Sequence, residues 1–406
     1  MAEELLYTRV SQMEPMLPDY SHGPDLSELA IEVVRKASAL SAALHPITRG
    51  GIVELVRSMN SYYSNLIEGH HTHPIDIEKA LVKNYSTEPA KRALQQESAA
   101  HIEVQRLIEQ RIAEDPEIDI WSVDFLCWIH QEFYRRLSGE FLVVETKDGT
   151  KKDIVPGQLR EDEVLVGLHL APAAADLTSF LDRFNRVYNS KNLKQINQII
   201  AVAASHHRLS WIHPFLDGNG RVTRLFTHAY LIKTRIDGHG MWTVSRGLAR
   251  SREAYMAALA GADAHRKSDY DGRGNLSNKG LLNFCVFFLE TALDQIGYMS
   301  SLLELDGMKK RILGYVERQV HLGELQKEAG YLLMETFLNG EIQRGEAPRI
   351  TGKPERSARR ILRDLLDKSL LVSDSKKGPV RIAFPAKIAG YYFPRLYPEG
   401  VESEMP

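Results

Sequence analysis

The stretch His213-Pro-Phe-Leu-Asp-Gly-Asn-Gly-Arg-Val-Thr-Arg224 is the most informative part of the chain, because it holds a histidine, a carboxylate, two glycines and two arginines within twelve residues. Gly218 and Gly220 carry no Cβ, so the backbone there can turn sharply and bring its N–H groups close to an anion. Beyond the turn, apolar residues recur at helical spacing, which places the turn at a helix N-terminus, where negative charge is favoured. Arg221 and Arg224 lie one turn apart on that helix. The stretch therefore predicts a phosphate site.

Two common phosphate loops do not fit this stretch. No Lys-Ser/Thr pair follows the glycines, as in a Walker A loop, and no glycine triplet ends a strand, as in a dinucleotide fingerprint. The stretch instead resembles the signature of the Fic family, H-[PF]-F-x-[DE]-G-N-G-R-x-x-R, and matches it at every defining position. This resemblance implies an all-α, Fic-type helical core with a small β-hairpin flap. It also implies transfer of AMP from ATP to a hydroxyl of a target protein.

The resemblance gives each residue of the stretch an expected role. His213 is expected to be the general base that deprotonates the target hydroxyl, because imidazole titrates near neutral pH. Asp217 is expected to hold Mg²⁺ between the α- and β-phosphates of ATP, because magnesium prefers one or two carboxylates plus phosphate oxygens. The other phosphate oxygens are expected to be bound by Gly218, Asn219, Gly220, Arg221 and Arg224.

An upstream segment, Ser64-Asn-Leu-Ile-Glu68-Gly69, resembles the inhibitory motif of the same family, [ST]-x-x-x-E-[GN]. We expect Glu68 to form a bidentate pair with Arg224 and so to occupy the guanidinium N–H groups that the γ-phosphate of ATP needs. Because both motifs lie in one chain, this inhibition would act in cis. Ser64 lies one turn before Glu68, where its hydroxyl could also fix the site. The plain alternative is a helix-end carboxylate followed by a glycine C-cap.

Two further segments resemble parts of a Fic protein. Residues 156–160 with 163–172 resemble the flap, a hairpin that holds the target by strand addition, and Val164 is its expected clamp. The alternative is a hairpin that only covers the core. Tyr255 is expected beside the adenine, although Asp263 stands where the family often has Asn.

Composition is that of a soluble enzyme with 406 residues, of which 43% are hydrophobic and 26% charged, and a formal charge of -2. Cys127 and Cys285 lie in apolar, helix-like runs, which favours buried thiols in a reducing compartment over a disulfide or metal site. No apolar run approaches the ~20 residues of a membrane helix, and the N-terminus lacks the basic start of a secretory signal. We therefore expect a cytoplasmic protein without a membrane partner.

The chain is expected to divide into an N-terminal helical region with the inhibitory helix (1–110), a Fic catalytic core (111–300) and a winged helix-turn-helix domain (301–406). Residues 1–25, with Pro15, Pro18 and Pro24, should form an extended arm. A hairpin is expected over 141–155, with its turn at Asp148 and Gly149. Apolar spacing predicts helices over 26–44, 52–67, 75–85, 97–113, 123–137, 173–189, 196–211, 222–233 and 281–299.

In the C-terminal part, further helices are expected over 308–319 and 335–339. The recognition helix of a winged helix is then expected, with Thr351 and Ser357 near its start and with Leu362, Leu365 and Leu366 buried, and a wing over 372–384. Residues 344–387 hold twelve Lys/Arg against five Asp/Glu, a surplus of seven positive charges. Such a surplus is the electrostatic footprint of DNA binding. Homodimerisation, or packing on the catalytic body, are alternatives.

Three functional hypotheses follow from these patterns. The first is a protein adenylyltransferase that uses ATP and Mg²⁺ to modify a Ser, Thr or Tyr hydroxyl of an unidentified protein, with Glu68 as its inhibitor. The second is a DNA-binding regulator whose nucleotide site senses ligand without turnover. The third is an enzyme that removes AMP from its target, with Glu68 positioning water. The intact His213 favours an enzyme, because a sensor needs no base.

Overall fold

The computed structural model describes residues 6–21, 25–145, 149–167, 169–398 and 401, and the statements below concern these residues. The all-α class expected from the sequence is confirmed: helices dominate, and the described strands form three small antiparallel sheets. The helices are α1 (Leu26–Ser41), α2 (Pro46–Ile67), α3 (Pro74–Leu81), α4 (Pro89–Glu114), α5 (Val123–Tyr134), α6 (Leu177–Tyr188), α7 (Gln195–Ile212), α8 (Asn219–Lys233), α9 (Ser245–Arg250), α10 (Arg252–Asp263), α11 (Asn278–Leu303), α12 (Leu305–His321), α13 (Ala329–Asn339), α14 (Ala347–Thr351), α15 (Glu355–Asp367) and α16 (Ala386–Tyr392). The strands are β1 (Val143–Glu145), β2 (Lys151–Asp153), β3 (Leu165–Val166), β4 (His169–Leu170), β5 (Glu341–Ile342), β6 (Leu371–Val372) and β7 (Val380–Ile382).

Helix α7 forms the centre of the molecule. Almost all of its side chains from Ile199 to Ile212 are buried, and α1, α6, α8, α10 and α11 pack around it. Even the guanidinium of Arg208 is buried, and it donates to the Pro15 carbonyl at 2.7 Å. Because α7 ends at Ile212, the signature stretch begins at the end of a buried helix. The site is thereby fixed to the core rather than to a loose loop.

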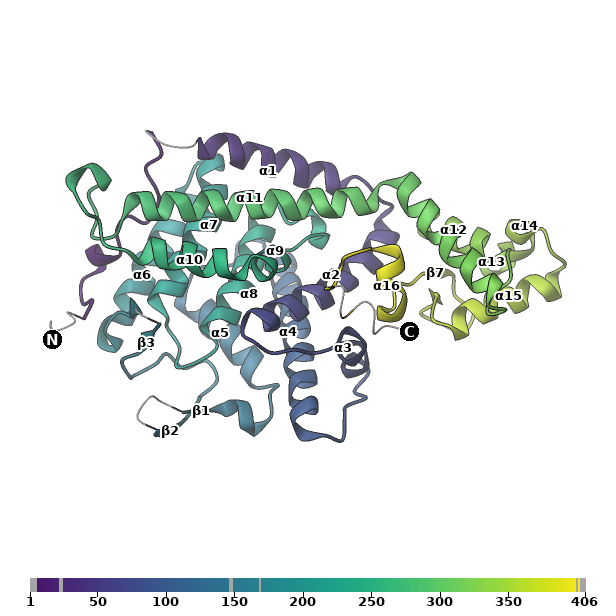
Figure 1. Ribbon diagram of the computed structural model, residues 1–406, viewed down its shortest axis with the longest axis horizontal. Helices are drawn as coiled ribbons and strands as arrows, with labels where there is room; N and C mark the ends of the chain where they lie inside the picture. Colours follow the sequence, from purple (N-terminus) through teal and green to yellow (C-terminus); the bar gives the residue numbers. More distant parts are fainter. Residues whose placement is uncertain (1–5, 22–24, 146–148, 168, 399–400, 402–406) are drawn as a thin grey trace.

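The N-terminal residues wrap the surface of this core, as expected, but they are not wholly extended. A short 3₁₀ helix spans Val10–Met13, and both Met13 and Met16 are buried. Pro24, which the sequence predicts in the same arm, lies outside the described residues. Helices α1 and α11 run side by side along one edge of the molecule (Figure 1).

Helix α2 begins six residues earlier than its apolar spacing predicts, at Pro46, a residue suited to the first helical turn. Gly50 and Gly51 obscure this start, since glycine weakens a helix. At Gly51 the reason for glycine is a close contact: a Cβ there would lie 3.3 Å from the ring of Phe384. Helix α2 therefore carries the inhibitory motif at one end and meets the C-terminal part of the chain at the other.

The C-terminal elements α12 to α15 and the sheet β5-β7-β6 project from one end of the helical body (Figure 1). Leu362 and Leu365 are buried as expected, whereas Leu366 is only partly buried. The expectation for Thr351 was wrong. Thr351 is a buried residue at the end of the separate helix α14, because Gly352 takes a left-handed conformation there and α15 starts only at Glu355. The winged-helix assignment stays a prediction.

The two hairpins expected from turn signals are present. Strands β1 and β2 pair around Gly149, which has a φ of +81°, while Asp148 lies outside the described residues. Strands β3 and β4 pair Leu165 with Leu170 in the segment expected to be the flap. Over the part of the chain that the structure describes, no helix is both long and apolar enough to span a bilayer.

Candidate active site

His213 stands at the junction of α7 and the glycine turn. It caps α7 in a left-handed conformation, with φ 51° and ψ 62°, and its N–H donates to the Leu209 carbonyl at 3.1 Å. Such a conformation is uncommon for a residue with a Cβ and tends to occur at functional sites. The buried Arg160 holds it in place, since its Nε donates to the His213 carbonyl at 2.8 Å. No local pattern in the sequence predicts this hydrogen bond.

The protonation of His213 differs from the expected neutral titration. Burial lowers the pKa of His213 to about 4, although a hydrogen bond to the Ser210 backbone opposes this effect. The imidazole is therefore uncharged at neutral pH, the state in which a ring nitrogen can accept a proton. Negative charge brought by a ligand would raise this pKa toward the working pH.

The turn after His213 is closed by its own side chains. Gly218 has a φ of +78°, and a Cβ there would lie 2.6 Å from the ring of Tyr134, so both backbone and space require glycine. The Asn219 amide donates to the Phe215 carbonyl at 2.7 Å and accepts from the Phe215 N–H at 2.9 Å. This amide shapes the turn, and the expected contact of Asn219 with phosphate stays a prediction.

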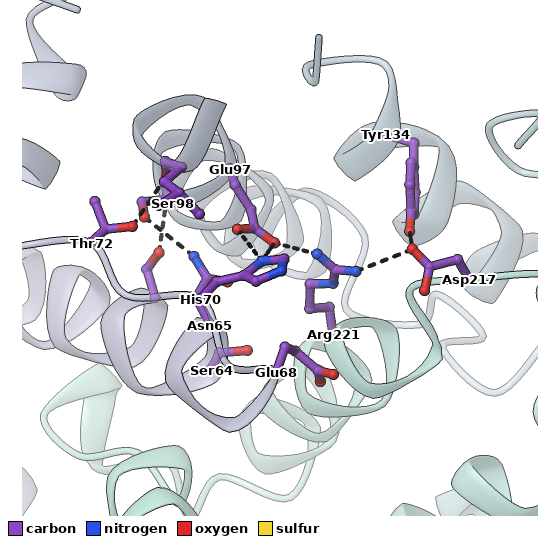
Figure 2. Close-up of polar contacts among 12 residues, drawn as sticks. Ser64, Asn65, Glu68, His70, Thr72, Glu97, Ser98, Tyr134, Asp217 and Arg221 are labelled. Atoms are coloured by element: carbon purple, nitrogen blue, oxygen red, sulfur yellow. Dashed lines mark hydrogen bonds and ion pairs between the residues drawn. The ribbon is translucent and has the colours of Figure 1, made fainter. Parts of the chain in front are cut away.

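Asp217 is the residue of the turn that suits a metal. Its side chain is 44% exposed, and Oδ2 accepts from the Tyr134 hydroxyl at 2.7 Å and from Arg221 Nη2 at 3.3 Å (Figure 2). Burial alone would raise the pKa of Asp217, but Arg221 and the Tyr134 hydroxyl lower it, so the group is a carboxylate. One ionised, partly open carboxylate fits Mg²⁺ that takes its other oxygens from phosphates and water.

Arg221 lies buried between an acid and an aromatic ring. Nη1 donates to Oε1 of Glu97, a fully buried carboxylate on α4, and the guanidinium lies 5.3 Å from the Phe133 ring centroid. Its Nε is buried and has no partner among the described residues. A buried donor without a partner is costly, and the other nitrogens of this guanidinium are held by Glu97 and Asp217.

Arg224 is held by both residues of the expected inhibitory motif. Nη2 donates to Glu68 Oε1 at 2.5 Å, Nε donates to the Ser64 hydroxyl at 2.8 Å, and Nη2 also reaches the Ser64 carbonyl at 3.0 Å. The pair is thus not bidentate as expected, because Ser64 takes the Nε position. Burial would raise the pKa of Glu68, but Arg224 and Arg221 lower it, so the carboxylate is charged.

Glu68 also lies against the first turn of α8. A Cβ at Gly220 would collide with Glu68 Oε1, so the absence of a side chain there lets the carboxylate approach the helix N-terminus. A helix N-terminus attracts anions through its free N–H groups and its dipole. The carboxylate of Glu68 therefore lies at the N-terminus of α8, where an anion is favoured.

Two further expected site residues are Tyr255 and Val164. Tyr255 is buried, its hydroxyl lies 2.8 Å from His206 Nε2, and its ring stacks on Phe287. Its place beside the adenine stays a prediction. Val164 is partly buried and its carbonyl accepts from the Ala171 N–H at 3.1 Å, so it continues the β3–β4 hairpin. Its role as a clamp stays a prediction.

The structure adds contributors that the sequence reasoning missed. Tyr134 and Glu97 bond to Asp217 and Arg221 across 83 and 124 positions of the chain. Arg160 joins the flap segment to the signature turn. No local pattern marks these residues, because each is defined by a partner that only the folded chain brings near. His206, His207 and Trp211 are buried.

The site is that of a helical domain with an anion-binding glycine turn, a neutral histidine and two buried arginines. Residues 120–231 match the family model described as Fic/DOC family. The chain thus carries a Fic domain over these residues.

Curated relatives named "Protein adenylyltransferase Fic" match the chain over limited lengths. The relative from Nematostella vectensis is 27% identical over 216 residues, which cover 52% of this chain and 47% of that protein. The relative from Drosophila erecta is 34% identical over 102 residues, which cover 25% of this chain and 19% of that protein. The matches thus span less than half the length of each of these relatives.

Solved structures share the fold at low sequence identity. A Fic family protein from Desulfovibrio desulfuricans G20 has a TM-score of 0.53 at 16% identity, over 90% of this chain and 98% of that one. Residues 134–508 of Fic-1 from C. elegans give a TM-score of 0.51 at 16% identity, over 70% and 75% of the two chains. These likenesses establish the fold.

Proposed function

We propose that this protein is an adenylyltransferase that transfers AMP from ATP to a Ser, Thr or Tyr hydroxyl of a target protein and is restrained in cis by Glu68. One observation carries the proposal: Glu68 pairs with Arg224 over the glycine turn of α8, in an anion position suited to a nucleotide phosphate. The names of the curated relatives support the same reaction class.

The residues of the site suit this reaction. The target hydroxyl oxygen attacks the α-phosphorus of ATP and forms a new P–O bond, while the bond to the oxygen bridging the α- and β-phosphates breaks and pyrophosphate departs. His213 accepts the hydroxyl proton, because it is neutral and immediately precedes the turn. Arg221, with its unpartnered Nε, stabilises the charge that collects on phosphate oxygens.

Asp217 would hold Mg²⁺ when ATP is bound. The metal would neutralise charge on the phosphate oxygens. The chain's own contribution is to keep Asp217 ionised and oriented, through the hydroxyl of Tyr134 and the guanidinium of Arg221.

Inhibition follows from the competition for Arg224. The guanidinium donates to Ser64 and Glu68, so a γ-phosphate cannot use the same N–H groups until Glu68 leaves. ATP that binds around Glu68 would then lack the alignment needed for in-line attack. Replacing Glu68 with glycine should free Arg224 without altering His213 or Asp217.

The test uses ATP labelled at either the α- or the γ-phosphorus, incubated with the Glu68→Gly variant in a lysate depleted of nucleotides. The proposal predicts label on protein from α-labelled ATP, no label from γ-labelled ATP beyond that in the lysate alone, and no α-label with the Glu68→Gly/His213→Ala variant. Mass spectrometry of the labelled bands identifies the modified hydroxyl. Label from the γ position only would indicate phosphate transfer and refute the proposal.

The same protein preparations separate the competing functions. A sensor without turnover predicts MgATP binding with no label from any variant. An enzyme that removes AMP predicts that the wild-type protein releases AMP from proteins labelled beforehand by Glu68→Gly, and that this release requires Glu68. Transfer by Glu68→Gly without such release by the wild type supports the proposed direction.

A second function, nucleic-acid binding by the C-terminal part, is favoured by the surface of α15. Arg356, Arg360 and Arg363 are exposed, recur on one helical face, and have no acidic partner among the described residues. Lys376 and Lys377 are exposed in the turn between β6 and β7. Unpaired cations on a helix face are available for phosphate groups of a nucleic acid.

Fluorescence anisotropy with duplex DNA tests this second function. Replacing Arg356, Arg360 and Arg363 together with alanine should weaken binding and reduce the slope of log K against log salt by about 3, roughly one unit for each arginine that binds a phosphate. Arg35→Ala on α1, where the guanidinium is paired with Glu32, is the matched control and should leave the slope unchanged. Equal binding by the triple variant and the control would exclude this face as the binding surface.

A further inference from the structure

The three residues that end the inhibitory helix form a rigid turn. Gly69 has a φ of +88°, its N–H donates to the Leu66 carbonyl at 3.0 Å, and the His70 N–H donates to the Asn65 carbonyl at 2.9 Å. This pair of bonds is a Schellman motif, which fixes the chain direction after a helix. We name Glu68, Gly69 and His70 the inhibitory turn. Because these two hydrogen bonds close a single turn, the side chains of Glu68 and His70 move together.

His70 gives the inhibitory turn a second contact with the active site. Its Nδ1 lies 3.0 and 2.8 Å from the two carboxylate oxygens of Glu97, the same carboxylate that accepts from Arg221 Nη1 (Figure 2). Glu97 is fully buried, whereas the His70 side chain is 35% exposed. A buried carboxylate is tolerated only when it is paired, and here Arg221 and His70, from different elements, share it.

The charges around His70 favour this arrangement. The hydrogen bond to Glu97 raises the pKa of His70 more than burial lowers it; Glu68 raises this pKa further, and Arg221 opposes. Among the described residues, the only aromatic ring that contacts the imidazole is Phe141, at 6.2 Å between centroids. The His70–Glu97 contact therefore favours the protonated imidazole.

The rest of α2 is held to α4 by buried polar contacts. The Ser61 hydroxyl donates to the Ser98 carbonyl at 2.9 Å, and the Asn60 amide donates to Gln105 at 2.7 Å. Moving the whole helix would break these buried hydrogen bonds, each at a cost of about 1–3 kcal/mol. Freeing Arg224 is therefore easier by displacing the inhibitory turn, and that movement pulls on Glu97 through His70.

We propose that Glu97 is a positioning residue of the nucleotide site, which fixes Arg221 for phosphate binding, and that His70 ties the inhibitory turn to Arg221 through the same carboxylate. Glu68 restrains Arg224 directly, and His70 acts on Arg221 through Glu97. Both signature arginines thus respond to one turn of the chain. This inference rests on the proposed function, because it assigns Arg221 to phosphate.

The first arm of the test changes Glu97 in the Glu68→Gly background and measures MgATP affinity by calorimetry. Glu97→Asp keeps the negative charge but shortens the side chain, so Arg221 shifts from its position. The dissociation constant of MgATP should then rise about tenfold. Glu97→Gln keeps the reach and removes the charge, so it should restore most of the affinity. Glu109→Asp is the matched control, because Glu109 lies on the same helix and pairs with Arg57 and His228. It should leave the affinity unchanged.

The second arm measures the rate of AMP transfer with Glu68 present and absent. His70→Ala should raise the rate of AMP transfer about fivefold when Glu68 is present, because the inhibitory turn loses its contact with Glu97 and keeps only that with Arg224. The same change should have no effect in Glu68→Gly. His71→Ala is the control, since His71 is exposed and is adjacent in sequence. Because His70 is partly exposed, its variant should fold even if a Glu97 variant does not.

Each outcome decides between the alternatives. Equal MgATP affinity for Glu97→Asp and Glu109→Asp overturns the positioning role. If Glu97→Gln weakens MgATP binding more than Glu97→Asp does, Glu97 acts through its charge alone, which also overturns the positioning role. An unchanged rate in His70→Ala overturns the link to the inhibitory turn. If no variant transfers AMP, the proposed function fails, and the affinity of the Glu97 variants still tests the positioning of Arg221.

Discussion

The carboxylate of Glu68 lies where a side chain at Gly220 would have to stand. The two residues are far apart in the sequence, yet a Cβ on Gly220 would collide with Glu68 Oε1 and would lie 3.1 Å from Arg224 Nη1. Gly220 is helical, so its requirement for glycine comes from this close approach and not from its backbone dihedral angles. The inhibitory contact and the glycine turn are therefore matched to each other.

This relationship predicts how Gly220→Ala affects stability. In the wild-type background the new methyl group meets Glu68, and we expect the free energy of unfolding to fall by about 1–3 kcal/mol. In Glu68→Gly the collision is absent, so the loss should be smaller by at least about 1 kcal/mol. Denaturant unfolding of the four proteins measures this difference. Equal losses in both backgrounds would show that Glu68 does not fill the space above Gly220.

Ser64 should contribute to inhibition less than Glu68. Its buried hydroxyl accepts from Arg224 Nε, and Ser64→Ala leaves that donor unpaired while Glu68 stays in place. We expect AMP transfer to rise by roughly threefold to tenfold, because one hydrogen bond to a charged group is removed. Initial rates with α-labelled ATP measure the change, and Ser58→Ala, on the same helix, is the control. A rate in Ser64→Ala equal to that of the control would remove Ser64 from the inhibitory contact.

Tyr134 should set the magnesium requirement. Its hydroxyl donates to Asp217 at 2.7 Å, and Tyr134→Phe removes this bond while keeping the ring beside Gly218. In the Glu68→Gly background we expect the Mg²⁺ concentration for half-maximal transfer to rise about tenfold. Tyr315→Phe, in α12, is the control. A lower maximal rate with an unchanged Mg²⁺ dependence would place the effect of Tyr134 elsewhere.

Buried histidines should make the fold labile to acid. Burial lowers the pKa of His206 to about 3 and the pKa of His130 to about 4. Unfolded histidine titrates near 6.5, so as pH falls below about 6.5 the unfolded chain binds protons that the folded chain does not. Stability is then lost by about 1.4 kcal/mol per pH unit for each such group, down to the folded pKa. This loss adds over the buried histidines.

His206→Gln isolates one of these groups. Glutamine cannot be protonated, so the dependence of unfolding free energy on pH between about 6 and 5 should lessen by roughly one proton. Some stability should be lost at pH 7.5, because His206 contacts Thr227 and Tyr255. Denaturant unfolding at several pH values measures both effects. A pH dependence identical to that of the wild type would contradict a neutral His206.

Much of the catalytic core followed from local patterns. Helices such as α7 and α8 show clear apolar spacing, and the signature turn marks its own place before α8. Local patterns did not predict the start of α2 or the break between α14 and α15. In each case a glycine marks the place, but the two glycines serve different purposes. Gly51 makes room for Phe384, whereas Gly352 takes a left-handed conformation. Composition alone does not distinguish these two uses.

The site was predictable where the chemistry lies within one segment. The Glu68–Arg224 contact was expected from two motifs, and Ser64 was expected to help fix the site, but the pairing of Ser64 with the Nε of Arg224 was not foreseen. The Asn219 amide bonds within the turn, and Tyr255 faces inward, because side-chain direction depends on neighbours that sequence does not reveal. The positions of Glu97 and Tyr134 required the folded arrangement for the same reason.

The most direct measurement of the central claim, that Glu68 restrains an AMP transferase by holding Arg224, compares initial rates of AMP transfer from α-labelled ATP. The wild type, Glu68→Gly, and Glu68→Gly with His213→Ala should be assayed at equal concentration and with equal folded fraction. We predict that Glu68→Gly is faster than the wild type by at least about tenfold and that the double variant is inactive. Equal rates for the wild type and Glu68→Gly, or undiminished transfer without His213, would contradict the account.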